Sequence, residues 1–197
     1  MKNIFIIFLL IFVSLAAYGK DNNYIAIKGG YDYSFQKEKG YTFSGQYYPS
    51  HKFYEADNTV LGISVGHKFN NLFRTELDYK HKIDNDVRGN NIRDAFGYPV
   101  RDKFTEHSLL INTFLHPFSY RLISPYFGLG CGWAWSNYAH IVKQNNFSYA
   151  AYLGADYNIY TNLILDLSIS YSNTLSDRKG LKNIHSVSGT IGIRYMF

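Results

Sequence analysis

Hydrophobic and polar residues alternate along the last eleven residues of the chain, VSGTIGIRYMF, with a period of two. Ser188, Thr190 and Arg194 hold even positions, while the odd positions are largely apolar. This period is typical of a β-strand with two unlike faces. A long amphipathic strand at a sheet edge recruits other strands and aggregates, whereas a closed barrel has no edge. The stretch 187–197 is therefore predicted to close a transmembrane barrel, with its odd face toward lipid.

Seven earlier segments repeat the alternation. The clearest is 72–81, where four charged residues in alternate positions, Arg74, Glu76, Asp78 and Lys80, share one face. Eight segments of about ten residues each give the even number and the length required of tilted membrane-spanning strands. The prediction is an all-β fold, an eight-stranded antiparallel transmembrane β-barrel. Its strands are expected at 23–35, 59–69, 72–81, 105–115, 125–135, 147–159, 163–172 and 187–197.

Long and short connections alternate between these strands. Polar stretches without a period are expected to form long loops at 36–58, 82–104, 136–146 and 173–185, with short connections between them, as at Asn70–Asn71 and Thr161–Asn162. Short periplasmic turns and long outer loops predict this alternation, and a soluble eight-stranded sandwich does not require it. Both termini are therefore expected in the periplasm and the long loops outside the cell.

Aromatic residues on the outward faces are expected near the strand ends, and aliphatic residues such as Ile63 and Ile111 near the middles. Two aromatic girdles around an apolar band are typical of membrane barrels. The preference of aromatic residues for strands would explain their number but not this placement. The predicted girdle residues are Tyr31, Tyr33, Phe69, Phe73, Tyr79, Phe127, Trp133, Trp135, Tyr149, Tyr157 and Tyr171.

The first nineteen residues are predicted to be a secretory signal. Lys2 precedes an apolar run at 4–13, and small residues stand before Lys20. A spanning helix needs about 20 apolar residues, so a retained membrane anchor is the less favoured alternative. The expected barrel is residues 20–197.

Cysteine content and net charge exclude little. Cys131 is the single cysteine, so no internal disulfide forms, and an outward apolar position suits it. The net charge of +5 comes from basic residues interleaved with acids. This pattern favours soluble loops and attraction to anionic lipid headgroups, and nucleic acid is not an expected partner.

The inward positions carry many charges. Since an eight-stranded barrel is just wide enough for side chains to fill it, and an unpaired buried ion is costly, these charges are expected to form a structural ion-pair core. A narrow gated ion path is the alternative. The inner glycines of 128–132 are expected to leave room for large charged side chains from opposite strands. The predicted core is Lys28, Asp32, Lys68, Arg74, Glu76, Asp78, Lys80, Glu106, Asp156, Asp166 and Arg194, with Asp32 or Lys28 and Asp166 expected beside Arg194.

Four stretches resemble a known family: YIAIKGGYDYS, LFRTELDYK, SPYFGLGCGWAW and the closing GTIGIRYMF. Their order and spacing resemble the small eight-stranded outer-membrane barrels of the OmpA, OmpX and opacity-protein type, often described as porin-family surface antigens. The resemblance implies a Gram-negative outer membrane, with its lipid and lipopolysaccharide as surroundings. It also implies an assembly signal read by the barrel-assembly machinery, formed by Ile191, Ile193, Tyr195 and Phe197.

Candidate catalytic pairs are weak. His107 lies beside Glu106 and Ser108, and His185 beside Ser186, but neighbours in a strand point to opposite faces. The seven histidines show no metal-ligand spacing, and no cofactor is expected.

A non-enzymatic surface protein is the favoured function. Loops 36–58 and 82–104 are too long for mere connections and are expected to meet host surface molecules, as in an adhesin, or to serve an envelope-stabilising role. A small-solute or ion channel and a lipid A-modifying enzyme are the alternatives.

Overall fold

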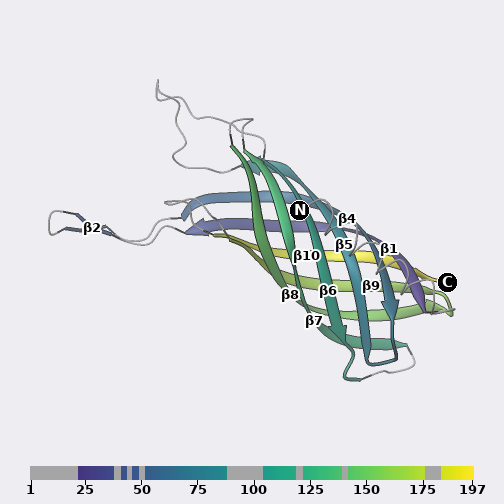
Figure 1. The fold of residues 1–197 in the computed structure, drawn as a ribbon. Coiled ribbons are helices and arrows are strands. Elements are labelled where there is room, and N and C mark those ends of the chain that lie inside the picture. Colours follow the sequence, from purple (N-terminus) through teal and green to yellow (C-terminus); the bar gives the residue numbers. More distant parts are fainter. Residues whose placement is uncertain are drawn as a thin grey trace.

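Eight strands of the computed structural model form one closed antiparallel barrel (Figure 1). The structure describes residues 22–37, 41–43, 46–48, 52–87, 104–118, 122–138, 142–175 and 183–197. The predicted signal sequence at 1–19 lies outside these residues and stays a prediction. In the described part of the chain, no helix is long and apolar enough to cross a membrane.

The barrel strands follow the chain as a meander, each paired with the next. They are β1 (Asn23–Lys37), β4 (Lys52–Lys68), β5 (Phe73–Val87), β6 (Phe104–Leu115), β7 (Ile123–Tyr138), β8 (Val142–Tyr160), β9 (Leu163–Thr174) and β10 (Ile184–Met196).

Closure depends on the pairing of the first strand with the last. Tyr24 of β1 lies opposite Met196 of β10, and the register continues to Phe35 opposite His185. The Phe197 backbone N–H also donates to the Asn23 carbonyl at 2.8 Å. The prediction of an eight-stranded antiparallel barrel closed by the C-terminal strand is confirmed.

Inward and outward side chains alternate as expected from the period of two. In β10, Ser188 and Arg194 are buried, whereas Ile191, Ile193 and Tyr195 are more than half exposed. Exposed large apolar side chains surround the barrel, and buried charged ones fill it, which is the reverse of a soluble protein. A lipid environment accounts for both faces because lipid covers the apolar band.

Barrel strands extend further at one end than predicted. β4 begins at Lys52 and β5 continues to Val87, so 52–58 and 82–87, which were predicted to be loop, are strand, while 88–103 lies outside the described residues. The predicted loop 136–146 is wrong, because β7 and β8 leave only residues 139–141 between them. Strands that continue beyond the apolar band have water on their outer face, so the alternation that identifies them disappears.

A short hairpin lies within the predicted irregular loop 36–58. β2 (Tyr41–Phe43) pairs with β3 (Gln46–Tyr48), and Figure 1 shows this hairpin beyond the end of the barrel. We call this end of the barrel, where β5 ends at Val87 and β6 begins at Phe104, the loop end.

The opposite end carries tight connections, and we call it the turn end. Asn70 Oδ1 accepts hydrogen bonds from the backbone N–H groups of Leu72 and Phe73, both at 2.8 Å. Asparagine side chains commonly stabilise tight turns in this way. Thr161 and Asn162 form the turn between β8 and β9. Both ends of the described chain reach this turn end of the barrel, as the Phe197–Asn23 hydrogen bond shows.

Candidate functional site: the ion-paired interior

The turn half of the barrel interior contains a dense group of ion pairs, which we call the turn-end cluster: Arg74, Glu76, Asp156, Asp166 and Arg194. Arg194 holds Asp156 with two hydrogen bonds, from Nη1 at 2.7 Å and from Nη2 at 3.2 Å, and its Nη2 also donates to Asp166. All five residues are at most 5% exposed. A bidentate arginine pair gives buried carboxylates both charge and hydrogen-bond partners.

Arg74 extends this cluster across the barrel. Its Nη1 donates to Glu76 Oε2 at 3.0 Å, and its Nη2 lies 3.5 Å from Asp166 Oδ2. β5 and β9 are four strands apart in either direction around the barrel, so Arg74 and Asp166 come from opposite walls. The contact therefore crosses the lumen.

Two lysines continue the network toward the middle of the barrel. Lys28 pairs with Glu76 and lies 3.7 Å from Asp78. Lys80 lies 3.4 Å from Asp78 and donates to the Tyr152 hydroxyl at 3.2 Å. Each lysine thus has two buried polar partners, as charges in a low-dielectric interior require.

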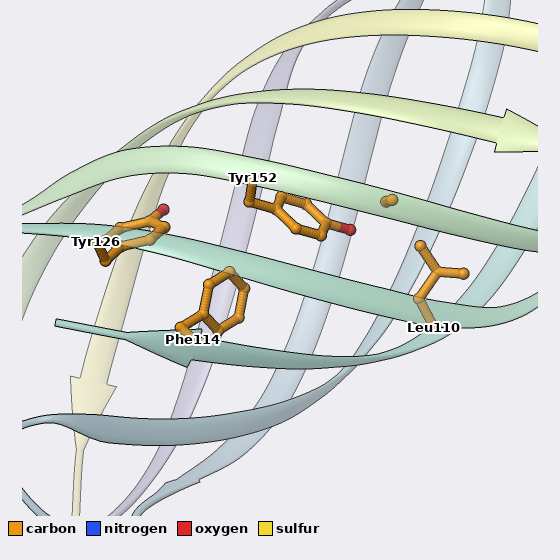
Figure 2. Packing of buried hydrophobic residues seen from close by; sticks show 5 residues of the cluster. Leu110, Phe114, Tyr126 and Tyr152 are labelled. Carbon is orange, nitrogen blue, oxygen red and sulfur yellow. The ribbon is translucent and has the colours of Figure 1, made fainter.

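An aromatic wall on β6, β7 and β8 packs beside these charges. Figure 2 shows the rings of Phe114, Tyr126 and Tyr152 close together, with Leu110 further along the wall. The Arg74 guanidinium carbon lies 3.9 Å from the centre of the Phe114 ring, a cation–π distance. The Tyr126 hydroxyl donates to Asp166 Oδ1 at 2.5 Å. The wall is both packing surface and hydrogen-bond partner.

The glycines of β7 make room for this wall, and not for charges from opposite strands as predicted. A Cβ on Gly128 would lie 2.4 Å from the Phe114 ring, and one on Gly130 would lie 1.9 Å from Asn112 Oδ1. These neighbours belong to β6, which pairs directly with β7. The prediction was wrong about the occupant because Phe114 and Asn112 lie directly opposite Gly128 and Gly130 in the register, so side chains of the paired strand fill the space over these glycines.

A smaller group fills the loop half of the interior, the loop-end cluster: Asp32, Lys82 and Glu106. Lys82 Nζ lies 3.3 Å from Asp32 and 3.1 Å from Glu106. Asp32 also accepts hydrogen bonds from the hydroxyls of Ser34 and Ser188 and from the Asn58 amide. Lys82 was missed because 82–104 was predicted to be a loop; extending the alternation of 72–81 by one step would have found it.

Lys82 changes the charge balance of the interior. The predicted set contains six acids and five bases, and Lys82 brings the bases to six.

The predicted surroundings of Arg194 need correction, because Asp156 joins Asp166 there, whereas Lys28 pairs with Glu76 and Asp32 with Lys82. Positions along a strand fix the face of a residue, but partners across the lumen depend on strand tilt.

Lys68 does not join the paired network. It is half-buried and has no ion pair among the described residues. It faces a cavity of about 60 Å³ at the turn end, also lined by Arg74, His116 and Asp156.

His116 Nε2 lies 3.1 Å from the Arg74 Nε donor, and burial together with the Arg74 charge lowers the His116 pKa to about 4. A neutral imidazole can accept this hydrogen bond.

The structure separates the candidate catalytic residues. Ser108 and Ser186 are buried in the interior, whereas His107 and His185 lie on the outer wall. The Ser186 hydroxyl accepts a hydrogen bond from Lys82 instead. Among the described residues, no group of three or more histidine, cysteine, aspartate or glutamate side chains could hold a metal ion.

The predicted girdle residues all lie on the outer wall. Phe73 and Phe127 share one cross-strand row at the turn end through Leu115, and Tyr79 and Trp133 share another toward the loop end through Leu109. Phe147, opposite Trp133 with ring centres 6.1 Å apart, extends the loop-end row and was missed. The four predicted assembly-signal residues, Ile191, Ile193, Tyr195 and Phe197, are all outward and more than half exposed.

A closed eight-stranded barrel with an apolar outer wall and an ionised interior defines the class of this chain: it has the fold of the small outer-membrane β-barrels of the OmpA and OmpX type. No protein-family model matches it. Among solved structures, Neisserial surface protein A (NspA) has a TM-score of 0.65 at 16% identity, covering 89% of this chain and 97% of its own. Outer membrane protein AlkL, determined in DMPC bilayers, has a TM-score of 0.53 at 13% identity, covering 90% and 91%. These identities show a shared fold.

One curated protein is similar in sequence. Outer membrane protein PagN of Salmonella typhimurium is 26% identical over 133 residues, which cover 57% of this chain. The match spans 56% of PagN, so the chain covers little more than half of that relative's length.

Proposed function

We propose that this chain is a non-enzymatic surface protein of the outer membrane, whose barrel anchors the segments at its loop end. In this proposal the turn end and both termini face the periplasm. The β2–β3 hairpin and residues 88–103 face the outside, where they meet host surface molecules as an adhesin or surface antigen. The surrounding partners are lipid and lipopolysaccharide.

The contact between Arg74 and Asp166 across the lumen carries this proposal. Since side chains from opposite walls meet at 3.5 Å, the interior serves as packing and not as a wide passage. A filled interior leaves the surface segments as the part of the molecule that can act on a partner. NspA, a solved structure of this fold, and PagN, a relative in sequence, are named as surface and outer-membrane proteins, and both support the same assignment.

Protease treatment of intact cells tests the orientation. Residues 88–103 contain Arg88, Arg93 and Arg101, while Arg121 lies between β6 and β7 at the opposite end. Trypsin added to cells should cut within 88–103 and spare Arg121, and permeabilised cells serve as the control. Cleavage at Arg121 in intact cells would reverse the proposed orientation.

Replacement of the hairpin segment 38–51 by a Gly-Ser linker tests the surface function. Binding of whole cells to cultured host cells should fall to the level of cells without the protein, while the amount of folded barrel stays unchanged. Replacement of 176–182 by the same linker is the matched control. Undiminished binding after the replacement of 38–51 and after that of 88–103 would contradict an adhesin role.

A narrow ion path is the second candidate, and the polar cavity beside Lys68 favours it. Planar-bilayer recordings should show no stepwise conductance if the lumen is filled throughout. Steps that change on Lys68→Met would support the ion path instead. For the enzymatic alternative, lipid A and phospholipid mass spectra should be identical with and without expression of the protein.

A further inference from the structure

Two histidine–tyrosine pairs lie on the outer wall toward the loop end, and the ion-paired interior uses neither. The Tyr79 hydroxyl lies 2.7 Å from His107 Nδ1, and the Tyr171 hydroxyl lies 2.6 Å from His185 Nδ1. The first pair joins β5 to β6 and the second joins β9 to β10, so each bridges neighbouring strands. The two pairs share one chemistry on two sides of the barrel.

The first pair includes a second imidazole. His81 lies opposite His107 in the strand register, and their rings stack with centres 4.3 Å apart and planes 18° apart. Trp135 is the next residue in this register, on β7. His81 Nδ1 is buried and has no hydrogen-bond partner among the residues the structure describes. Because this atom is enclosed, a ligand from outside does not reach it, and Nε2 is the ring nitrogen of His81 left to bind one.

The second pair is supported in a similar way. The His185 ring stacks on Phe35 with centres 5.5 Å apart, and its Nδ1 also lies 3.1 Å from the Asn173 amide nitrogen. Both imidazoles are thus fixed by stacking and by hydrogen bonds to Nδ1. With the tyrosine hydroxyl donating to Nδ1, Nε2 carries the proton and remains a donor.

The neighbouring side chains decide between a dissolved ligand and a lipid. Trp133, Trp135 and Tyr171 are 39–50% exposed beside the pairs, and they belong to the band predicted to contact lipid. Donors at the edge of that band meet lipid headgroups, and phosphate oxygens are their strongest natural acceptors there. We propose two sites, one formed by His81 with His107 and one by His185, each of which binds the phosphate of a lipid headgroup in the leaflet at the loop end. These sites rest on the proposed orientation only for their assignment to the outer leaflet, where lipopolysaccharide carries phosphates.

Imidazole NMR shifts test the proposal without any variant. The folded barrel in zwitterionic detergent micelles is titrated with short-chain phosphatidic acid, and the Cε1–H resonances of the histidines are followed. We expect saturable shifts at His81, His107 and His185. His67 is the internal control, because its ring also packs on an aromatic side chain, Phe69, but lies at the turn end of the outer wall. Equal shifts at His67 would overturn the proposal.

Two further ligands test whether the phosphate group and the acyl chains are both needed for binding. Diacylglycerol with the same chains should leave the resonances unshifted, and inorganic phosphate at equal concentration should bind far more weakly. Equal binding of either would overturn a lipid-phosphate site.

The variants His107→Phe and His185→Phe should each weaken phosphatidic acid binding roughly tenfold at their own site, the factor expected for loss of a charge-assisted hydrogen bond. His67→Phe should change nothing. Since a micelle has no sides, a reversed orientation in cells would refute the proposed function and leave this result standing.

Discussion

The two halves of the barrel interior neutralise their buried carboxylates with different side chains. In the turn-end cluster, two arginines hold three carboxylates and pack against aromatic rings. In the loop-end cluster, one lysine lies between two carboxylates, and hydroxyl and amide groups supply the remaining hydrogen bonds. The turn half therefore has the denser set of ion pairs and ring contacts.

Loss of Arg194 and loss of Lys82 would leave the neighbouring carboxylates with different numbers of hydrogen-bond partners. Among the described residues Asp156 takes its side-chain hydrogen bonds from Arg194 alone, whereas Asp32 keeps three neutral donors if Lys82 is lost. An uncompensated buried charge costs more than a lost hydrogen bond between groups that retain other partners. The turn half is therefore expected to carry more of the stability.

Arg194→Leu should give the largest effect. It removes the cation that hydrogen-bonds both Asp156 and Asp166, which lie directly opposite each other in the strand register, and leaves them only the longer contacts of Arg74 at 3.9 and 3.5 Å. The free energy of unfolding should fall by about 3–5 kcal/mol, the usual cost of breaking a buried pair. Urea titration of the barrel in lipid vesicles measures it. Adding Asp156→Leu should restore part of the loss, and a loss below about 1 kcal/mol would contradict the role given to Arg194.

Lys82→Met should cost less, about 2 kcal/mol, because Asp32 retains its hydroxyl and amide donors. The same urea titration gives the comparison directly. If this variant were less stable than Arg194→Leu, the order proposed for the two clusters would be wrong.

Gly128→Ala should disturb only the turn half, since its Cβ would meet the Phe114 ring at 2.4 Å. The expected loss is about 1–2 kcal/mol, as for other overpacked interiors. Gly189→Ala is the matched control on the outer wall, where a new Cβ has no neighbour within 4 Å. It should change stability by less than about 0.5 kcal/mol, and equal losses in both variants would indicate a backbone effect.

His116 gives the smallest effect, and it depends on pH. Its pKa is near 4 in the folded protein and near 6.5 when unfolded, so the unfolded chain takes up the proton first as pH falls. Its contribution is therefore complete above pH 6.5 and is lost toward pH 4. Between pH 7 and 5.5 the wild type should lose about 1 kcal/mol more than His116→Gln. Equal pH profiles would refute a neutral His116.

The sequence was enough for the fold because a period of two assigns every residue of a strand to a face. It placed Arg74, Asp166 and Arg194 in the interior from alternation alone. It failed at Lys82 and at 136–146, where strands continue past the apolar band and both faces meet polar surroundings.

The alternation of polar and apolar residues did not predict which inward side chains contact each other. Arg74 on β5 contacts Asp166 on β9, four strands away. This contact depends on strand tilt and on closure of the barrel, which the alternation does not predict. Tyr24, Phe114 and Tyr126 hold inward positions, but with aromatic residues assigned to the girdles their place in the interior was not recognised. The stacked pair of His81 and His107 likewise required the register of β5 against β6.

The facing carboxylates of Asp156 and Asp166 also bear on the order in which the barrel assembles. Like charges directly opposite on neighbouring strands disfavour pairing, so the β8–β9 hairpin carries a local repulsion by itself. Arg194, which relieves it, arrives with the last strand, and that strand also closes the barrel against β1. The hydrogen bonds from Arg194 to both carboxylates therefore form only as β10 docks, which couples the completion of this interior to the closing step.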